Sequence, residues 1–484
     1  MLAHPATLLR NASRPVVALF AAVPVLFLFW YLFAGTLHPL PQGALHYLIP
    51  ATSSNTDLCK LLVSGQILHY PIPALINWGA PEAKDAYKQH LAKIETILNY
   101  LNKLQATKTA ADDDLILILD GFDIWLQLHH EVLIKRYFKV IDDTNARSEA
   151  LYGHPARHSV LFGPDKICWP IDFSRPACWA VPDLPLDRGA FGPPAGTEDH
   201  NMPRWLNSGT IMGPLGDMRD MFQATLDLTQ KNHTTDSDQF YFANVWGDQE
   251  YARLSSDPTR LQKRMDIIDP QESRIRESSH FRAASVIEPG QRTEYFVTLD
   301  YLSELFQTLA FYKGFLTWMR PDHSWTPSVA GEYPGVERYK FEVPQDVIDS
   351  PSPYADLKTY NGTMTTAQAG LASRMWENIE LCINTITNQV PVSLHFTGEK
   401  GLRAIWWEKI WFQAESRLLR QAALAAPERP LNGGKPINGK VWVNGLPPGS
   451  DGDRSGAMGD NEEFLTWDRL CATHEHWVFD NHAA

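Results

Sequence analysis

Two acidic side chains that follow a long apolar run are the first residues of this chain whose types and spacing suggest chemistry. Residues 115–119 are all Leu or Ile, and Asp120, Gly121, Phe122 and Asp123 come directly after them. A continuous apolar run is typical of a strand buried on both faces of a parallel sheet, and ligands bind beyond the carboxyl ends of such strands. Two carboxylates there would suit Mg²⁺ or Mn²⁺ and a diphosphate. A plain Asp-Gly turn after a strand is the alternative.

A small polar triplet lies within a second, largely apolar segment at residues 205–213. Asn207 and Ser208 offer an amide and a hydroxyl group, and Gly209 would let the backbone approach a ligand closely. An ordinary turn before a strand explains the same residues. The triplet therefore indicates a ligand-binding segment only in combination with other parts of the chain.

Acidic and amide side chains come directly before the aromatic residues 240–242. Asp238 and Gln239 would hold an acceptor hydroxyl or the sugar of a donor. Asp236 or Ser237 would alternatively act as a helix N-cap, because short polar side chains accept hydrogen bonds from the first free amides of a helix. Both interpretations place a helix start at this point of the chain.

A histidine ends a short strand-like segment much further along the chain, at residues 391–395. An imidazole can complete a Mn²⁺ site that carboxylates begin. Gly398 and Lys400 follow His395 and can meet phosphate oxygens. A histidine at a strand end is also a common structural residue, so this segment alone leaves both interpretations open.

The overall composition indicates a folded protein and excludes one class of partner. The chain has 484 residues, of which 44% are hydrophobic and 20% charged, as is usual for globular proteins. Its net charge of −13 argues against nucleic acid, since binding to many phosphates requires a basic surface. A nucleotide remains compatible with this charge where a metal ion offsets its phosphates.

The N-terminal segment predicts a membrane anchor. Residues 15–35 carry no charge, and their number matches the roughly 20 residues that cross a bilayer. Arg10 and Arg14 precede this segment and Asp57 is the first charge after it, so residues 1–14 should stay in the cytoplasm. A cleaved signal peptide is the alternative. We expect a single-pass type II protein whose remaining residues face the lumen of the Golgi apparatus or endoplasmic reticulum.

Sequons and cysteines agree with a lumenal location. Asn232 and Asn361 each begin an Asn-X-Thr sequon for N-glycosylation. Cys168 and Cys178 are close enough in sequence to close a small loop, which an oxidising compartment would permit. The odd total of five cysteines leaves at least one thiol or an intermolecular bridge.

The order of the expected elements favours an α/β fold with a largely parallel sheet, because strands and helices alternate. The predicted strands are 58–63, 115–119 and 159–163, and the predicted helices are 84–104 and 132–142. The predicted parts of the chain are a cytoplasmic tail at 1–14, a transmembrane anchor at 15–35, a stem at 36–56, a catalytic domain at 57–420 with an insertion at 312–368, and a flexible segment at 421–484.

In this order the polar segments resemble the glycosyltransferase domain of the procollagen lysyl hydroxylases and, more distantly, the collagen galactosyltransferases. That family shows Asp-x-x-Asp after a strand, Phe-x₅-Cys-Trp-Pro, Leu-Asn-Ser-Gly, an acidic run before Asp-Gln, a Leu-Asp…Phe-Gln pair and His-x-x-Gly. The matching residues are Asp120 and Asp123, Phe162 with Cys168-Trp169-Pro170, Leu206 to Gly209, Asp238-Gln239, Leu299-Asp300 with Leu305-Phe306-Gln307, and His395 with Gly398.

The resemblance implies a GT-A fold, which is a Rossmann-like mixed sheet flanked by helices, and a reaction that uses a UDP-sugar and Mn²⁺ or Mg²⁺. It makes Asp120, Asp123 and His395 the metal ligands, and Lys400 would help to stabilise the charge on the departing UDP. The other matching positions are Trp78 for the uracil, Lys84 for the diphosphate, Tyr87 and Trp169 for the surroundings of the sugar, and Asn207, Asp238 and Gln239 for the transferred sugar or the acceptor.

The resemblance predicts a hexosyltransferase that moves glucose or galactose, with retention of configuration, to a hydroxyl group of a glycan or protein. The chain departs from the family pattern at Ser237, which interrupts the acidic run, and at 79–83, which replaces a glycine-rich loop before Lys84. These departures motivate an alternative, a catalytically inactive lumenal protein that binds a UDP-sugar or a glycan. An Asp-dependent phosphohydrolase would leave the segments around Asn207 and His395 without a function.

Overall fold

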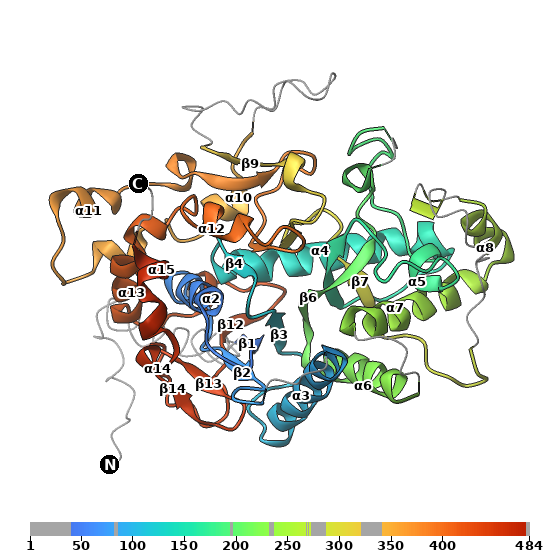
Figure 1. The fold of residues 1–484 in the computed structure, drawn as a ribbon, viewed down its shortest axis with the longest axis horizontal. Coiled ribbons are helices and arrows are strands. Elements are labelled where there is room, and N and C mark those ends of the chain that lie inside the picture. The colour runs from blue at the N-terminus through green and yellow to red at the C-terminus, as the bar shows by residue number, and fades with distance from the viewer. Residues whose placement is uncertain are drawn as a thin grey trace, which may run out of the picture. The chain divides into compact units, whose positions relative to one another are not determined.

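A mixed, mostly parallel sheet flanked by helices organises the chain (Figure 1). The computed structural model describes residues 40–81, 86–193, 197–231, 237–267, 269, 271–272, 287–320 and 341–480. Within these residues the sheet has nine strands in the order β14-β13-β2-β1-β3-β6-β5-β7, with β12 paired to β1. Its strands are β1 Gln42–Pro50, β2 Ala74–Ile76, β3 Leu115–Leu119, β5 Val160–Asp165, β6 Trp205–Pro214, β7 Val297–Leu299, β12 Val441–Asn444, β13 Ala457–Gly459 and β14 Phe464–Leu465.

The strand β1 lies inside this sheet, between β2 and β3, where the sequence predicted a stem. It pairs in parallel with both neighbours, and Leu45, Tyr47 and Ile49 are buried. The prediction of a stem at 36–56 is therefore wrong for residues 42–50. Prolines flank this short apolar run and serines follow it, so the sequence did not look like a strand. In the structure the side chains of β1 are covered on both faces of the sheet.

The segment that was predicted as the first strand, 58–63, is part of helix α2, Thr56–Ile67. Asn55 caps this helix, and its side-chain oxygen accepts a hydrogen bond of 2.8 Å from the Leu58 amide. The apolar run that suggested a strand is nearly completely buried, and such a run has the same appearance in a buried helix and a buried strand. The asparagine before it was the informative signal for a helix start.

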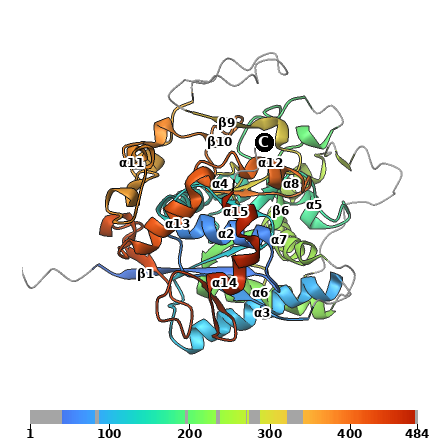
Figure 2. The same cartoon turned by 60° about the vertical axis from the view of Figure 1, so that its left-hand side comes forward.

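Helices lie against the sheet, and strands β3 and β6 are buried along nearly all of their length. Helices α3 and α6 lie side by side, as Figures 1 and 2 both show. The predicted helix 84–104 is confirmed as α3 over its described residues, and the predicted helix 132–142 is part of the longer helix α4. The main helices after α2 are α3 Ala86–Ala106, α4 His130–Tyr152, α5 Pro176–Trp179, α6 Leu215–Lys231, α7 Asp238–Ser255, α8 Pro258–Met265, α10 Gln345–Ile348, α11 Thr366–Leu371, α12 Leu402–Trp407, α13 Ser416–Ala425, α14 Trp467–Cys471 and α15 Glu475–Phe479.

Two smaller sheets join distant parts of the chain. Strand β11, Ser393–His395, lies between β4, Ile124–Leu126, and β8, Phe306–Thr308. Strand β9, Leu316–Met319, pairs with β10, Leu381–Asn384. The expected insertion at 312–368 thus contributes a strand, β9, and a short helix, α10, to the fold, and its residues 321–340 lie outside the described part of the chain.

Residues 421–480, the described part of the C-terminal segment, contain strands and helices, which corrects the prediction that 421–484 is flexible. Strands β12 and β13 pair with β1 and β2 of the large sheet. A disulfide between Cys59 and Cys471 joins α2 to α14, 412 positions away. Strand pairing and a covalent link outweigh the local abundance of glycine and proline, which had indicated a mobile chain.

The remaining cysteines agree with the sequence analysis. Cys168 and Cys178 form a disulfide, and Cys382 is a buried free thiol. The predicted anchor at 15–35 lies outside the described residues. Among the helices that the structure describes, none combines the length and apolar character that a membrane span requires.

Candidate metal centre

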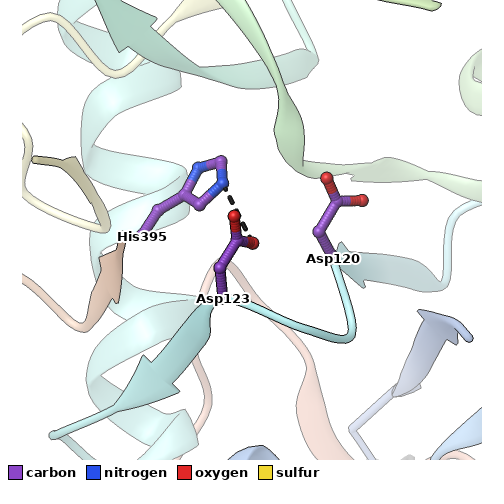
Figure 3. Close-up of side chains that lie close together, drawn as sticks. All are labelled: Asp120, Asp123 and His395. Atoms are coloured by element: carbon purple, nitrogen blue, oxygen red, sulfur yellow. Dashed lines mark ion pairs between the residues drawn. The ribbon is translucent and has the colours of Figure 1, made fainter. Parts of the chain in front are cut away.

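Asp120, Asp123 and His395 come together just beyond the end of β3 (Figure 3). Each offers a ligand atom within 4.8 Å of the ligand atoms of the other two. The Nε2 atom of His395 lies 3.3 Å from Oδ1 of Asp123. The fold therefore unites two carboxylates and an imidazole that lie far apart in the sequence, and we call these three residues the metal-ligand group.

Strand pairing positions His395 beside the carboxylates. Asp123 directly precedes β4, and β11 runs antiparallel to β4 with His395 opposite Ile124. The Phe396 amide donates a hydrogen bond of 2.8 Å to the Asp123 carbonyl, which extends this pairing by one residue. The imidazole thus reaches the group because a strand from the C-terminal half of the chain is added to the β4 edge.

A glycine on β6 makes room for the metal-ligand group. The Asp120 amide donates a hydrogen bond of 2.9 Å to the Gly209 carbonyl. A Cβ atom on Gly209 would lie 2.2 Å from Cε1 of His395 and 3.0 Å from Oδ2 of Asp120. Because these distances leave no room for a methyl group, the site requires glycine here. The sequence predicted that the Gly209 backbone approaches a bound ligand closely. In the structure this backbone lies close to two of the candidate metal-ligating side chains, His395 and Asp120.

Asn207 lies at an irregularity of β6 and contacts a different carboxylate. The pairing of β5 with β6 shifts after Phe162, so that Gly163 lies opposite Asn207 and residues 208–210 bulge. The Asn207 amide donates to Oδ2 of Asp165 at 3.4 Å, and its oxygen accepts from the Gly209 amide at 3.0 Å. Burial raises the pKa of Asp165 to about 6, against the opposing Asn207 hydrogen bond. In this arrangement Asn207 holds the bulge that presents Gly209.

Lys93 is a residue of this site that the sequence analysis missed. Its Nζ atom lies 2.7 Å from Asp120 and 2.8 Å from Asp238, and it donates to the Ser208 carbonyl at 3.2 Å. Burial by itself would lower the pKa of Lys93, but the two carboxylates raise it above its ordinary value. A signal was present, since Lys93 falls four residues before the buried Ile97 on the apolar face of α3.

Asp238 reaches the site from the first turn of α7. The Ser237 hydroxyl accepts a hydrogen bond from the Phe240 amide, which confirms the N-cap interpretation for Ser237. Oδ1 of Asp238 accepts from the Ser208 hydroxyl at 3.1 Å and from the Gln239 amide at 2.8 Å. Ser237 thus caps the helix, and its neighbour Asp238 is the residue that lines the cleft.

A cleft of about 640 Å³ opens beside the metal-ligand group. This volume falls within the range of roughly 300–1,000 Å³ that is usual for ligand sites. Lys400 lies at the cleft, with its Nζ atom 2.5 Å from Oδ2 of Asp123. The cleft is lined by Asp120 to Asp123, Asp238, Lys93, Lys88, Ala92, Thr96 and Lys400, together with residues of the segments 50–55 and 76–81.

The two aspartates of the metal-ligand group have different electrostatic surroundings. Burial would raise the pKa of Asp123, but the His395 imidazole and the Lys400 ammonium hold it below its ordinary value. Burial raises the pKa of Asp120, and nearby carboxylates add to this effect against the opposing Lys93. Two oxygen donors and one imidazole suit Mn²⁺ or Mg²⁺, so the residues present fit the metal that was expected.

Three other predicted binding residues, Trp78, Trp169 and Gly398, are described by the structure but are not among the residues that line the cleft. Trp78 is half-buried against the core in the turn that also contains Asn77, a cleft residue. Trp169 is 52% exposed on the loop after β5, and Gly398 adopts a positive φ of 73° beside Ala310. Lys84, the side chain of Tyr87 and the sequon at Asn232 lie outside the described residues.

No protein-family model matches this chain, and no curated protein matches it in sequence. The fold and site define it as an α/β protein with a candidate divalent-metal centre beside a cleft. The resemblance to the glycosyltransferase domain therefore stays a prediction, and the functional argument depends on the geometry of the cleft.

Proposed function

We propose that this protein is a metal-dependent glycosyltransferase that moves glucose or galactose from a UDP-sugar to a hydroxyl group of a glycan or protein. The observation that carries this proposal is the convergence of Asp120, Asp123 and His395 on one point beside the cleft. Strand pairing brings His395 beside Asp123, and the ligand atoms of all three side chains then lie within 4.8 Å of one another, as a shared ion would require.

The side chains of the cleft have complementary functions in this proposal. A divalent ion held by Asp120, Asp123 and His395 would neutralise the diphosphate and stabilise the charge that develops on UDP. Lys400, which is 54% exposed, is placed to exchange its contact with Asp123 for one with a phosphate oxygen. Asp238 would accept a hydrogen bond from a sugar or acceptor hydroxyl, with Lys93 fixing its orientation.

A GT-A fold and a lumenal location belong to the same proposal. The mixed sheet with the acidic residues at the end of β3 supports the fold. Two disulfides support an oxidising compartment, and Asn361 of the second sequon is exposed and accessible to glycosylation. We therefore place the protein in the Golgi or endoplasmic reticulum membrane, with the cleft in the lumen.

The test is a donor screen with the full-length protein. UDP release is measured from UDP-glucose, UDP-galactose and other UDP-sugars, with Mn²⁺ and with a chelator. We expect Mn²⁺-dependent release from at least one hexose donor, and its loss in Asp123→Ala. The matched control is Asp143→Ala, which removes an exposed carboxylate on α4 and should retain activity. Metal-independent release, or full activity of Asp123→Ala, would contradict the proposal.

One observation favours a second candidate, a lumenal protein that binds the UDP-sugar or a glycan without catalysis. Lys400 pairs with Asp123 and Lys93 pairs with Asp120, so lysine cations already balance both carboxylates. Calorimetric titration of UDP with and without Mn²⁺ separates the two candidates. Binding without turnover for every donor and acceptor would favour the second.

A further inference from the structure

A second cavity, which shares no residue with the cleft, lies between α2, α4 and the C-terminal segment. It has a volume of about 100 Å³. We call it the histidine pocket and define it by His69, His129, His130, Asp356, Asn444 and Arg454. His69 follows α2, while His129 and His130 begin α4, and Asn444 ends β12. The pocket is thus formed by elements that the large sheet and the C-terminal segment hold together.

Three of these residues have polar contacts that hold the wall together. The Nε2 atom of His69 lies 2.6 Å from Oδ2 of Asp356. Arg454 lies 3.3 Å from Nδ1 of His69 and donates to the carbonyls of Ala423, Leu424 and Ala426 at the end of α13. These contacts give the polar groups of His69, Asp356 and Arg454 partners within the protein, so these three residues do not require a ligand.

The other three carry buried polar atoms that have no hydrogen-bond partner among the described residues. These atoms are Nε2 of His129, both ring nitrogens of His130, and Oδ1 of Asn444. His129 and His130 are only 4% and 5% exposed. An unsatisfied buried polar group costs roughly 1–3 kcal/mol, so several of them in one cavity indicate that something else supplies their hydrogen bonds.

The unpartnered atoms are mainly hydrogen-bond acceptors. The Nδ1 atom of His129 lies 3.3 Å from the Leu68 carbonyl, so it carries the proton and leaves Nε2 with a lone pair. Asn444 already donates through its amide nitrogen to the His69 carbonyl at 3.2 Å, which leaves its oxygen. Burial lowers the pKa of His129 to about 4 and that of His130 well below its ordinary value, so both rings are neutral at pH 7.

Charge and geometry restrict the kind of ligand. Arg429 and Arg454 line the pocket together with Glu131, Asp356 and Glu428, so neither sign of charge dominates. Among the described residues, three metal-ligating side chains lie close enough to share an ion only in the metal-ligand group at the cleft, and not in the histidine pocket. The acceptor-rich wall therefore calls for a neutral molecule with hydroxyl donors.

We infer that the histidine pocket binds a small neutral polyol of about the size of glycerol. Its hydroxyl groups donate to His129, His130 and Asn444. The volume of about 100 Å³ suits this size, since a single water needs about 10–15 Å³ and a larger cavity, of about 150 Å³, holds benzene, which has as many heavy atoms as glycerol. This inference does not depend on the proposed function, because the pocket and the cleft are lined by different residues.

The experiment uses the full-length protein with chelator present, so that metal-dependent binding in the cleft does not contribute. The probes are the small polyols ethylene glycol, glycerol and erythritol, titrated by saturation-transfer NMR. We expect at least one probe to bind in the millimolar range. His130→Phe should weaken that binding at least tenfold, whereas Asp123→Ala in the cleft should change it less than twofold.

The variants are chosen so that loss of folding is distinguishable from loss of binding. Neither ring nitrogen of His130 has a partner among the described residues, so phenylalanine of similar shape should leave the melting temperature equal or higher. His129→Phe is a second variant that should also weaken binding. His154→Phe, just after α4, is the matched control and should bind as the wild type does.

Three results would overturn the inference. One is that no probe binds to the wild type, which would mean that the pocket holds only water. Another is that His130→Phe and His129→Phe both bind as tightly as the wild type. The third is that inorganic phosphate, or Zn²⁺ titrated without chelator, binds instead and loses its affinity in His130→Phe, which would change the class of ligand.

Discussion

The cleft and the histidine pocket both place polar side chains in buried surroundings, but they balance these side chains in different ways. In the cleft each of the three carboxylates lies within 2.8 Å of a lysine ammonium. In the histidine pocket, His129, His130 and Asn444 retain atoms that lack a partner among the described residues. A ligand of the cleft must therefore exchange existing ion pairs, whereas a ligand of the pocket supplies missing hydrogen bonds. Removal of a lysine from the cleft should therefore lower the free energy of unfolding. Removal of an unpartnered histidine from the pocket should not.

The largest effect is expected for Gly209→Ala, which acts on the geometry of the cleft. A Cβ atom would overlap with the His395 ring at 2.2 Å, so the imidazole must leave the metal-ligand group. We expect Mn²⁺ affinity to fall by about 100-fold or more, by analogy with other changes that displace metal ligands. Calorimetric titration with Mn²⁺ measures this. Gly370→Ala, where an added Cβ atom meets nothing within 4 Å, is the control. Unchanged Mn²⁺ affinity in Gly209→Ala would contradict the site.

Lys93→Met should destabilise the fold, because it leaves Asp120 and Asp238 without their shared cation. The side chains of Lys93 and Asp238 are 13% and 6% exposed, so we expect a loss of about 3 kcal/mol in the free energy of unfolding. Urea unfolding measures it. Mn²⁺ should restore part of the loss, since it supplies the missing positive charge.

The control for Lys93→Met is Lys313→Met, whose side chain is 58% exposed and pairs with Glu399, which is 62% exposed. We expect this control to change the stability by about 1 kcal/mol or less. Equal losses for the two variants would show that the buried ion pairs of Lys93 with Asp120 and Asp238 contribute no more to the free energy of unfolding than an exposed pair does.

In the histidine pocket, His129→Phe should make the protein less sensitive to acid. The folded pKa of His129 is lowered to about 4 by burial, whereas the unfolded chain binds this proton below about pH 6.5. The wild type therefore loses roughly 3 kcal/mol between pH 6.5 and pH 4 through this residue, and the variant does not. Unfolding free energies of both proteins at pH 7 and pH 4.5 measure the difference.

The comparison of the two proteins is necessary because buried carboxyls have the opposite pH dependence. Burial raises the folded pKa of Asp165 to about 6 and that of Asp300 to about 7. These groups bind protons more readily in the folded state, so they contribute stability as the pH falls below these values. They are present in both proteins and cancel. A difference between wild type and His129→Phe that does not vary with pH would contradict the assignment.

The smallest effect on stability is expected for Lys400→Met, at the exposed edge of the cleft. The side chain of Lys400 is 54% exposed, so its pair with Asp123 should contribute about 0.5 kcal/mol or less. Mn²⁺ affinity should rise a few-fold because a competing cation is removed, and UDP affinity should fall. Calorimetry measures both ligands. A decrease in Mn²⁺ affinity would show that Lys400 helps to hold the metal-ligand group in place.

The candidate ligands were predictable because they lie at the ends of short apolar strands. The run before Asp120 has the composition of a buried strand, and the structure confirms it as β3. His395 was named as a partner from its residue type and from the family resemblance. The antiparallel pairing of β11 with β4, which brings it to Asp123, joins residues too distant for any local pattern to indicate.

Other parts of the fold escaped prediction for identifiable physical reasons. Apolar runs in β1 and α2 look alike in sequence, and only their packing makes one a strand and the other a helix. Lys93 was missed because a charged residue on an apolar helix face is usually interpreted as solvent-exposed. Its contacts come from β3 and α7, which lie on separate segments of the chain.

By itself the sequence determined which side chains can do chemistry here: two carboxylates after a buried strand, a glycine that tolerates close approach, and a distant histidine. These features are local, since they depend on residue type and on the length of an apolar run. Only the tertiary structure decided which of these side chains meet, that Lys93 balances them, and that a separate pocket leaves three ring nitrogens of His129 and His130 without hydrogen-bond partners among the described residues. Those outcomes depend on strand order and helix packing, which are set by burial summed over the whole chain and not by any one segment.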